Sequence, residues 1–306
     1  MKIALVGQQD FGKAVLEAFL ARGDQVGAVF CAPEKEGARP DALRAAAQEK
    51  GLKVHQFKSL RAPEAVKAMR EAGAEIGIMA FVLQFAPREF VNVPGCGTLQ
   101  YHPSLLPKYR GPSSINWPIA RGEKETGLSI FRPTDGLDEG AVILQKRTPV
   151  GDNDTLGTVY FERLFPMGVQ AMLEAADLVV AGRHKETAQD ESQASYEGWF
   201  REAEARIHWA SHVDAIHDLI RSSDPAPGAW TTLGGAKLQL FDSRKERVRT
   251  FGAVRGRIGE VLGTEDGRLV VATQGGRIHA GKAKLGDGKK VAAAELGVKA
   301  GQILGT

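Results

Sequence analysis

The chain has 306 residues, of which 43% are hydrophobic and 25% are charged, so it is long enough for two folded domains of an ordinary globular protein. Its formal net charge of +3 is too small to indicate nucleic-acid binding by itself, and no apolar run approaches the ~20 residues that span a bilayer. The two cysteines, Cys31 and Cys96, are not spaced as metal ligands, which is typical of a reducing cytoplasm and argues against a structural zinc site.

From its N-terminus the chain alternates short apolar runs with amphipathic segments. We predict strands over residues 2–7, 25–30, 53–56, 76–81 and 97–101, and helices over residues 11–22, 41–50 and 63–72. This alternation is typical of right-handed βαβ units, in which helices cover both faces of a parallel sheet. The first turn, GQQDFG, lacks the G-x-G-x-x-G spacing of a dinucleotide site, so an NAD-dependent enzyme is disfavoured.

The second half of the chain becomes rich in short strands. We predict a strand pair at 127–132 and 141–149, a helix over 155–180 that breaks at Pro166–Gly168, a helix over 211–220, and short strands at 237–241, 256–262, 267–273 and 276–285. Short strands separated by glycine turns are typical of a small β-barrel. Residues 183–205 are polar and aperiodic, so we predict an α/β domain (1–182), a linker (183–205) and a β-barrel domain (206–306).

His102 follows the end of a predicted strand and precedes a loop rich in proline, serine and glycine. In parallel α/β sheets, ligands bind at the carboxyl ends of the strands. Asp135 and Asp138 lie in a second loop, DGLDEG, where aspartate and glycine also serve as ordinary turn residues. One of these carboxylates can pair with His102. A carboxylate beside an imidazole orients it and stabilises the imidazolium, so such a pair can move protons or stabilise a tetrahedral oxyanion. A covalent acyl-enzyme is disfavoured because the chain has no G-x-S-x-G motif.

Two further polar clusters have a structural and a functional interpretation. His208 and His212 are four residues apart and His217 follows, but without an H-E-x-x-H pattern we expect surface or packing roles instead of a metal site. The stretch from Arg244 to Arg257, RKERVRTFGAVRGR, holds six basic residues against one glutamate. We favour a solvated edge strand with charged guards over a site for a polyanion such as tRNA.

The segment HPSLLPKYRGPSSINW followed by DGLDEG resembles the signature of the folate-dependent formyltransferase superfamily. The resemblance implies a Rossmann-like domain that binds 10-formyltetrahydrofolate, followed by a small OB-like β-barrel. It implies that His102 and Asp138 are the catalytic pair, and that neither a metal nor NAD(P) takes part. The sequence is more similar to the N-terminal hydrolase domain of 10-formyltetrahydrofolate dehydrogenase than to methionyl-tRNA formyltransferase, as in FVLQFAP, SYEGW and PGAW.

The resemblance also assigns roles to residues around the pair. By the family motifs, the folate pocket is lined by Gln84, Phe85, Ala86, Ser104, Leu105, Leu106 and Pro107. We expect Arg110 to hold its loop through hydrogen bonds to backbone carbonyls. The transferases carry asparagine two residues before the histidine, whereas this chain has Gln100, whose amide is one methylene further from the backbone.

The predicted function is formyl transfer from 10-formyltetrahydrofolate to water or to a small amine, with Gln100, His102 and Asp138 in the catalytic centre. Methionyl-tRNA formyltransferase is the alternative, although the loop CAPEKEGARPDALRA is shorter and less basic than the insertion by which that enzyme grips tRNA. A non-catalytic folate-binding paralogue is the second alternative. The sequence predicts a cytoplasmic protein with no membrane partner, and it leaves the formyl acceptor and the oligomeric state open.

Overall fold

The structure is a computed structural model that describes residues 1–248 and 256–305. It forms two compact units, which are interleaved in the sequence. The N-terminal unit comprises residues 1–111, 127–147 and 163–196, and the C-terminal unit comprises residues 112–126, 148–162 and 197–306. The domain boundaries predicted from the sequence, 1–182 and 206–306 with a linker between them, stay predictions. Part of that linker, residues 183–196, belongs to the N-terminal unit.

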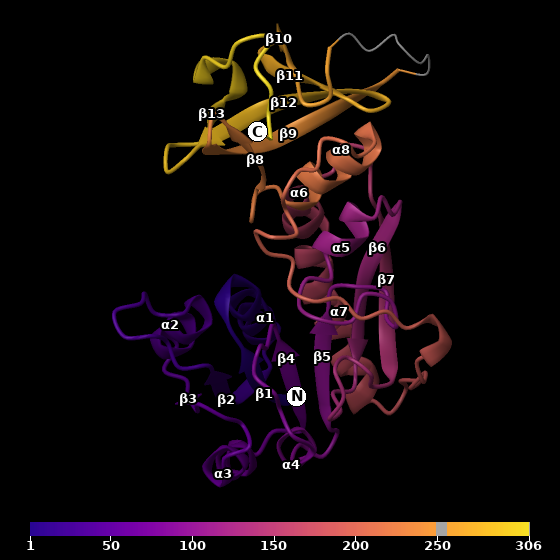
Figure 1. Cartoon of the computed structure of the whole chain (residues 1–306). Coiled ribbons are helices and arrows are strands. Elements are labelled where there is room, and N and C mark those ends of the chain that lie inside the picture. The colour runs from indigo at the N-terminus through magenta and orange to yellow at the C-terminus, as the bar shows by residue number, and fades with distance from the viewer. Residues whose placement is uncertain (249–255, 306) are drawn as a thin grey trace. The chain divides into compact units, whose positions relative to one another are not determined.

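A seven-stranded sheet organises the first half of the chain (Figure 1). Its strands are β1 (Lys2–Gly7), β2 (Gln25–Cys31), β3 (Val54–Gln56), β4 (Ile76–Ala80), β5 (Thr98–His102), β6 (Glu125–Phe131) and β7 (Val142–Pro149). Their order is β3-β2-β1-β4-β5-β6-β7; β1 to β5 run parallel, and β6 is antiparallel to β5. The order reverses at β1, and the crevice at the carboxyl ends there is where open α/β sheets bind ligands.

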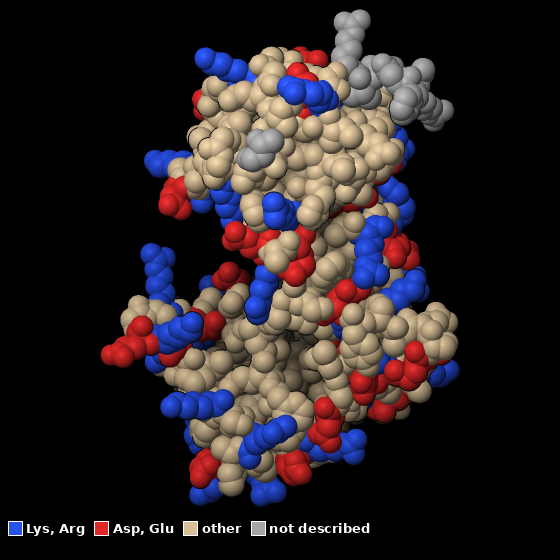
Figure 2. Space-filling view, viewed as in Figure 1, with Lys and Arg blue, Asp and Glu red and all other residues tan. Residues whose placement is uncertain are grey.

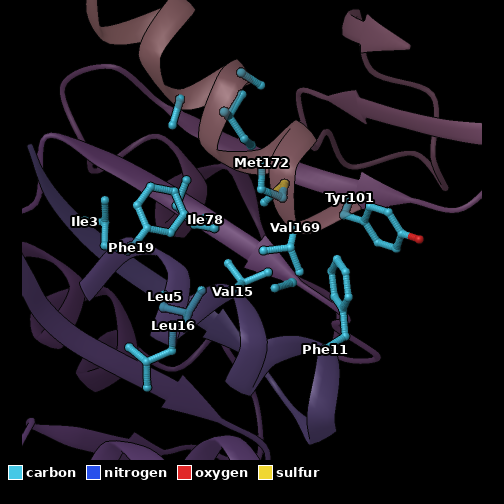
Figure 3. Packing of buried hydrophobic residues seen from close by; sticks show 14 of the residues in the cluster. Ile3, Leu5, Phe11, Val15, Leu16, Phe19, Ile78, Tyr101, Val169 and Met172 are labelled. Carbon is cyan, nitrogen blue, oxygen red and sulfur yellow. The ribbon is translucent and has the colours of Figure 1, made fainter. Parts of the chain in front are cut away.

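Helices cover both faces of this sheet. They are α1 (Gln9–Ala21), α2 (Ala42–Glu49), α3 (Pro63–Ala72), α4 (Arg88–Val91) and α7 (Phe165–Val180). Apolar residues of α1 and α7 pack with alternate residues of β1, β4 and β5 in one core, shown in Figure 3, while α3 and α4 contribute to the core on the opposite face. The predicted Rossmann-like α/β architecture is therefore confirmed.

The core of the α1 and α7 layer holds β5 firmly in place. Tyr101 points into this core, where its ring lies 4.3 Å from the ring of Phe11 (Figure 3). Gly168 of α7 allows this approach, because a Cβ built there would lie 2.7 Å from the Tyr101 ring. Successive strand residues face opposite sides of a sheet, so Gln100 and His102 face away from this core.

Several predicted boundaries in this half differ from the structure, most of them by one or two residues. Strand β5 includes His102 as its last residue, instead of ending at residue 101. The predicted helix over 155–180 breaks earlier than at Pro166–Gly168: α6 (Leu156–Val159) leads into a π-helical turn (Tyr160–Leu164), and α7 follows. Pro166 is in the first turn of α7, where a missing backbone N–H costs no intrahelical hydrogen bond.

The C-terminal unit contains an antiparallel sheet in the order β10-β11-β12-β9-β8, with β13 paired to β12. The strands are β8 (Ala229–Leu233), β9 (Ala236–Arg247), β10 (Val261–Glu265), β11 (Arg268–Thr273), β12 (Gly276–Leu285) and β13 (Val291–Ala292), and the helices of the unit include α5 (Asn116–Ala120) and α8 (Val213–Ser222). The predicted small C-terminal β-domain is confirmed as this antiparallel sheet. Strand β8 was not predicted from the sequence. A two-residue turn, Gly234–Gly235, joins it to β9, and both glycines have positive φ, as such hairpins require.

The basic stretch from Arg244 to Arg257 lies partly outside the described residues, because residues 249–255 are not described. Lys245 and Arg247 each place a nitrogen 2.8 Å from the Asp214 carboxylate. Strand β9 lies between β12 and β8, so the interpretation as an edge strand applies at most to its C-terminal part, beyond the residues paired with β8. On the face drawn in Figure 2, acidic and basic side chains are interspersed. In the part of the chain that is described, no helix is long and apolar enough to cross a membrane.

Candidate active site

The predicted catalytic side chains lie at the carboxyl end of β5. His102 is its last residue, and the side chain is almost fully buried. Its Nε2 lies 2.8 Å from the carbonyl oxygen of Tyr109. Because a carbonyl oxygen can only accept a hydrogen bond, Nε2 carries the proton in this arrangement. Nδ1, on the other side of the ring, is therefore the nitrogen that the Tyr109 carbonyl leaves available for a proton.

Asp138 faces Nδ1 of His102 from the loop between β6 and β7. One carboxylate oxygen, Oδ2, lies 3.5 Å from Nδ1 of His102 and accepts a hydrogen bond of 2.9 Å from the backbone N–H of Gly111. The Asp138 side chain is also buried. The two side chains thus lie together, as the sequence predicted. A proton on Nδ1 of His102 would face the Asp138 carboxylate.

The loop from residue 103 to residue 111 is held by hydrogen bonds from a hydroxyl of its own and from side chains of β6 and β7. Ser104 donates from Oγ to the carbonyl of Lys108 at 2.7 Å, and Ser129 of β6 donates to the carbonyl of Ser104 at 2.7 Å. Gln145 of β7 donates to the carbonyl of Leu106 at 3.0 Å. Ser104 and Leu106 are buried. The hydroxyl of Ser104 thus shapes the loop, and the folate contacts predicted for residues 104–107 stay predictions.

The other predicted folate residues follow β4. Gln84 donates from Nε2 to the carbonyl of Phe57 at 2.8 Å, so its amide fixes the path of the segment. The ring of Phe85 is 42% exposed and lies 4.5 Å from the guanidinium carbon of Arg61, whereas Ala86 is buried. Phe85 is therefore the one residue of these three that presents a large apolar surface. Its role in folate binding stays a prediction.

Gln100 lies two residues before His102 on the same side of β5 and is half-buried. Its side-chain amide makes no hydrogen bond to any residue among 1–248 and 256–305. The amide is thus available to a bound molecule, but nothing within the described protein fixes its direction.

Arg110 departs from the sequence prediction. Its guanidinium donates to side chains, and not to the predicted backbone carbonyls: two parallel hydrogen bonds of 2.9 and 2.6 Å reach the Glu191 carboxylate, and another reaches the hydroxyl of Tyr196. The hydrogen bonds that Arg110 donates to the Glu191 carboxylate are the main reason why the pKa of Arg110 is raised above its ordinary value. The expected role, holding the loop, is achieved by hydrogen bonds from the buried guanidinium to side chains, including the exposed Glu191 carboxylate.

Ser195 was missed by the sequence analysis, which placed it in the linker. Its Oγ accepts the N–H of Tyr109 at 2.8 Å, its carbonyl accepts the N–H of Arg110 at 2.9 Å, and its N–H donates to the carbonyl of Pro107 at 3.2 Å. Residues 107–110 thus pair with this segment as an extra strand would. A polar segment without periodicity carries no signal for such a role.

In the loop that joins β2 to α2, the carboxylate of Glu34 accepts three hydrogen bonds. Glu34 accepts from the N–H of Asp41 at 3.0 Å, from Gln56 at 2.6 Å and from Arg44 at 2.8 Å. Burial raises the pKa of this carboxyl, but the hydrogen bonds outweigh burial and lower the pKa from 4.5 to about 2. The loop is thus held by an ionised glutamate and is not a basic surface.

The stabilisation from Glu34 is therefore fully present above pH 4.5 and is lost as the pH falls toward 2. We expect Glu34→Gln to lower the free energy of unfolding by a constant amount near neutral pH, and this difference from wild type to shrink below pH 4.5. Urea unfolding at a series of pH values measures it. A difference that does not depend on pH would show that the carboxylate charge is not what stabilises the loop.

The three histidines of the C-terminal unit have separate roles. His217 is fully buried, with Nδ1 2.7 Å from Ser243 Oγ and Nε2 2.8 Å from the carbonyl of Asp152, and burial lowers its pKa. His212 caps the N-terminus of α8, whereas His208 is exposed. Within residues 1–248 and 256–305, no group of three or more His, Cys, Asp and Glu side chains is placed to hold a metal ion.

Comparisons with known proteins match both halves of the chain. The family model described as "Formyl transferase" matches residues 1–176, and "Formyl transferase, C-terminal domain" matches residues 200–299. The cytosolic 10-formyltetrahydrofolate dehydrogenase of Mus musculus is 41% identical over 79% of this chain and 27% of its own length. The methionyl-tRNA formyltransferase of Geotalea uraniireducens is 30% identical over 95% of this chain and 92% of its own length. The predicted resemblance and its order are confirmed.

The chain spans about a third or less of the length of the dehydrogenases that it matches. Among solved structures, HypX from Aquifex aeolicus in complex with tetrahydrofolic acid superposes with a TM-score of 0.66 at 20% identity, over 97% of this chain and 46% of that one. The N-formyltransferase from Helicobacter canadensis gives a TM-score of 0.68 at 18% identity, over 92% and 98%. At these identities the two structures show a shared fold.

Proposed function

The chain belongs to the formyl transferase family, and from that premise we propose that it removes the formyl group of 10-formyltetrahydrofolate and transfers it to water. The observation that carries the proposal is the buried pair of His102 and Asp138, whose Nδ1 and Oδ2 are 3.5 Å apart at the carboxyl end of β5. Apo active-site contacts are often longer than in the substrate complex, so this separation suits a pair that tightens around a reacting molecule.

The proposed reaction proceeds through a tetrahedral intermediate. A water oxygen forms a bond to the formyl carbon, the carbonyl oxygen becomes an oxyanion, and the bond between carbon and N10 then breaks. Asp138 or His102 takes the proton of the attacking water, and a proton reaches N10 as formate leaves. The imidazolium of His102 stabilises the oxyanion, and the Asp138 carboxylate stabilises the imidazolium. No electron changes hands, so the step requires no NAD(P), and we propose that it uses no metal.

We place the folate beside the loops that follow β4 and β5. The exposed ring of Phe85 offers an apolar surface. The other residues that we propose for the folate pocket belong to the same two loops: Gln84, Ala86, Ser104, Leu105, Leu106 and Pro107. In the solved HypX structure the ligand is tetrahydrofolic acid, which supports a folate in a protein of this fold. The two free cysteines support the proposal of a cytoplasmic protein.

Water is the acceptor we favour, and a small amine is the nearest variant of that reaction. Gln100 replaces the asparagine of the transferases, and the loop after β2 is built around the Glu34 carboxylate. The second candidate is methionyl-tRNA formyltransferase, favoured by a relative of that name that matches nearly the whole chain. A folate-binding paralogue without activity is disfavoured because both titratable groups are retained.

Consumption of 10-formyltetrahydrofolate by the purified chain, with and without methionyl-tRNA, tests these functions. Steady release of tetrahydrofolate and formate without an acceptor supports the hydrolase. Release only with methionyl-tRNA supports the transferase instead. Folate binding without release in either tube, and with small amines also inert, would leave the non-catalytic paralogue.

Gln100 gives a prediction within this proposal. Because its amide has no partner in the described part of the chain, we expect Gln100→Ala to leave the melting temperature unchanged. If the amide donates to the formyl oxygen, kcat falls by about 10²-fold, the usual effect of losing one oxyanion donor. Steady-state kinetics and a thermal melt measure both quantities. An unchanged kcat would remove Gln100 from the catalytic centre.

A further inference from the structure

Gln189 connects the two loops that carry the proposed catalytic pair. Its Nε2 donates to two carbonyl oxygens of the loop between β6 and β7, those of Asp138 and Gly140, each at 2.7 Å. Its Oε1 accepts from Arg110, from Nε at 3.1 Å and from Nη2 at 2.8 Å. Both amide hydrogens and the amide oxygen are thus used within the protein.

Arg110 stands between the two backbone groups that orient the pair. The carbonyl of Tyr109 accepts from His102, and the N–H of Gly111 donates to Asp138. The guanidinium of Arg110 is fully buried and reaches the backbone of Asp138 through Gln189. These contacts close a ring that contains both catalytic side chains and both of their loops.

The backbone of Asp138 requires such support. Its φ of +56° lies in the left-handed region, which residues other than glycine rarely adopt. The carbonyl of Asp138 itself accepts the Gln189 hydrogen bond, so the contact acts on the strained residue directly. A shift of this peptide would move the Asp138 carboxylate relative to Nδ1 of His102, because the carbonyl and the carboxylate of Asp138 are only a few covalent bonds apart.

We propose that Gln189 is a positioning residue for formyl transfer, which holds Asp138 at the distance from His102 that the reaction needs; the inference rests on the proposed function of that pair. The side chain at position 189 must offer two donors to the carbonyls of Asp138 and Gly140 and an acceptor to Arg110. Glutamate offers no donor and lysine offers no acceptor, so a glutamine side chain fits both demands. Gln189 itself touches no reacting atom.

The test compares Gln189→Ala and Gln189→Glu with wild type in the full chain. Glutamate keeps the acceptor for Arg110 and removes both donors to the Asp138 loop. We expect each variant to lower kcat for 10-formyltetrahydrofolate hydrolysis by about 10- to 100-fold, the effect of displacing a catalytic group by about an ångström. KM should change less than twofold, and the pH of half-maximal kcat/KM should shift, because the carboxylate that stabilises the imidazolium has moved.

Gln193→Ala is the matched control, because Gln193 lies in the same segment and donates only to the exposed Asp190, at 3.1 Å. We expect its kcat and pH profile to match wild type. If Gln189→Ala does not fold, the kcat and pH profile of Gln189→Glu alone test the positioning role. Wild-type kcat and pH profile in a folded Gln189→Glu variant would overturn the positioning role alone. A wild-type chain inert with every acceptor would instead overturn the proposed function, and the positioning role with it.

Discussion

Replacing His102 with alanine is expected to lower kcat for 10-formyltetrahydrofolate consumption by about 10²- to 10⁴-fold, the range that general acid–base catalysis supplies. The affinity for folate should change little, because the residues proposed to line the folate pocket lie on other parts of the two loops. Nδ1 of His102 is the proton-accepting atom that faces Asp138, at 3.5 Å, and alanine removes it. Steady-state kinetics together with equilibrium binding of tetrahydrofolate separate the two effects.

Two control variants separate catalysis from folding. His102→Gln places an amide donor near the position of Nε2, within reach of the carbonyl of Tyr109, but offers no imidazole nitrogen to take a proton, so it should be as inactive as His102→Ala. His217→Asn removes a buried histidine of the C-terminal unit that hydrogen-bonds Ser243 and Asp152. It should lower stability without lowering kcat per folded molecule. Turnover retained in His102→Ala would contradict the assignment of the catalytic centre.

The parallel sheet was predictable because its pattern is local. Each apolar run of β1, β2 and β4 is buried on both sides, so it reads as a strand by composition alone. The break before α7 was misplaced because the rule for proline in a helix describes the interior, and Pro166 sits in a first turn. Strand β8 was missed although tryptophan and threonine favour strands, because AWTTL has only five residues and directly follows the proline- and glycine-containing turn SSDPAPG.

The site was predictable only as far as topology brings strand ends together. His102 is the last residue of β5, and Asp138 lies in the loop after the neighbouring strand β6. Because β6 is antiparallel to β5, the strand order makes the two segments neighbours but does not by itself bring Asp138 to His102; the path of the loop between β6 and β7 does. The partners of Arg110 did not follow from any pattern. Gln189 and Glu191 are about eighty residues away in a polar segment, and a hydrogen bond across that separation leaves no periodicity in the sequence.

Backbone groups, as well as side chains, orient the two residues that we propose to be catalytic. The carbonyl of Tyr109 sets the tautomer of His102, and the N–H of Gly111 holds one oxygen of Asp138. Both groups are anchored by Ser195 and by the buried guanidinium of Arg110. Mutations of Gln189, Glu191 or Ser195 should therefore affect the chemistry, although none of these residues is proposed to react.

Asp138→Asn is expected to lower kcat by about 10²- to 10⁴-fold. Asparagine has nearly the same size, and its amide oxygen can still accept the N–H of Gly111, so the loop should keep its conformation and the melting temperature should change little. The amide cannot take a proton from water, and it cannot stabilise the imidazolium of His102. Kinetics of the variant over a range of pH values measure the loss.

Asp135→Asn in the same loop is the matched control for this variant. Asp135 is exposed and pairs with Arg88 at 3.0 Å, so its loss should change kcat less than about twofold, as for an exposed ion pair.

The double variant His102→Ala, Asp138→Asn tests whether the pair acts as a unit. If it does, the second substitution adds little to the first, because each removes the same proton-transfer path. Losses that multiply would mean that Asp138 and His102 act in separate steps, and that Asp138 serves the water while His102 serves N10.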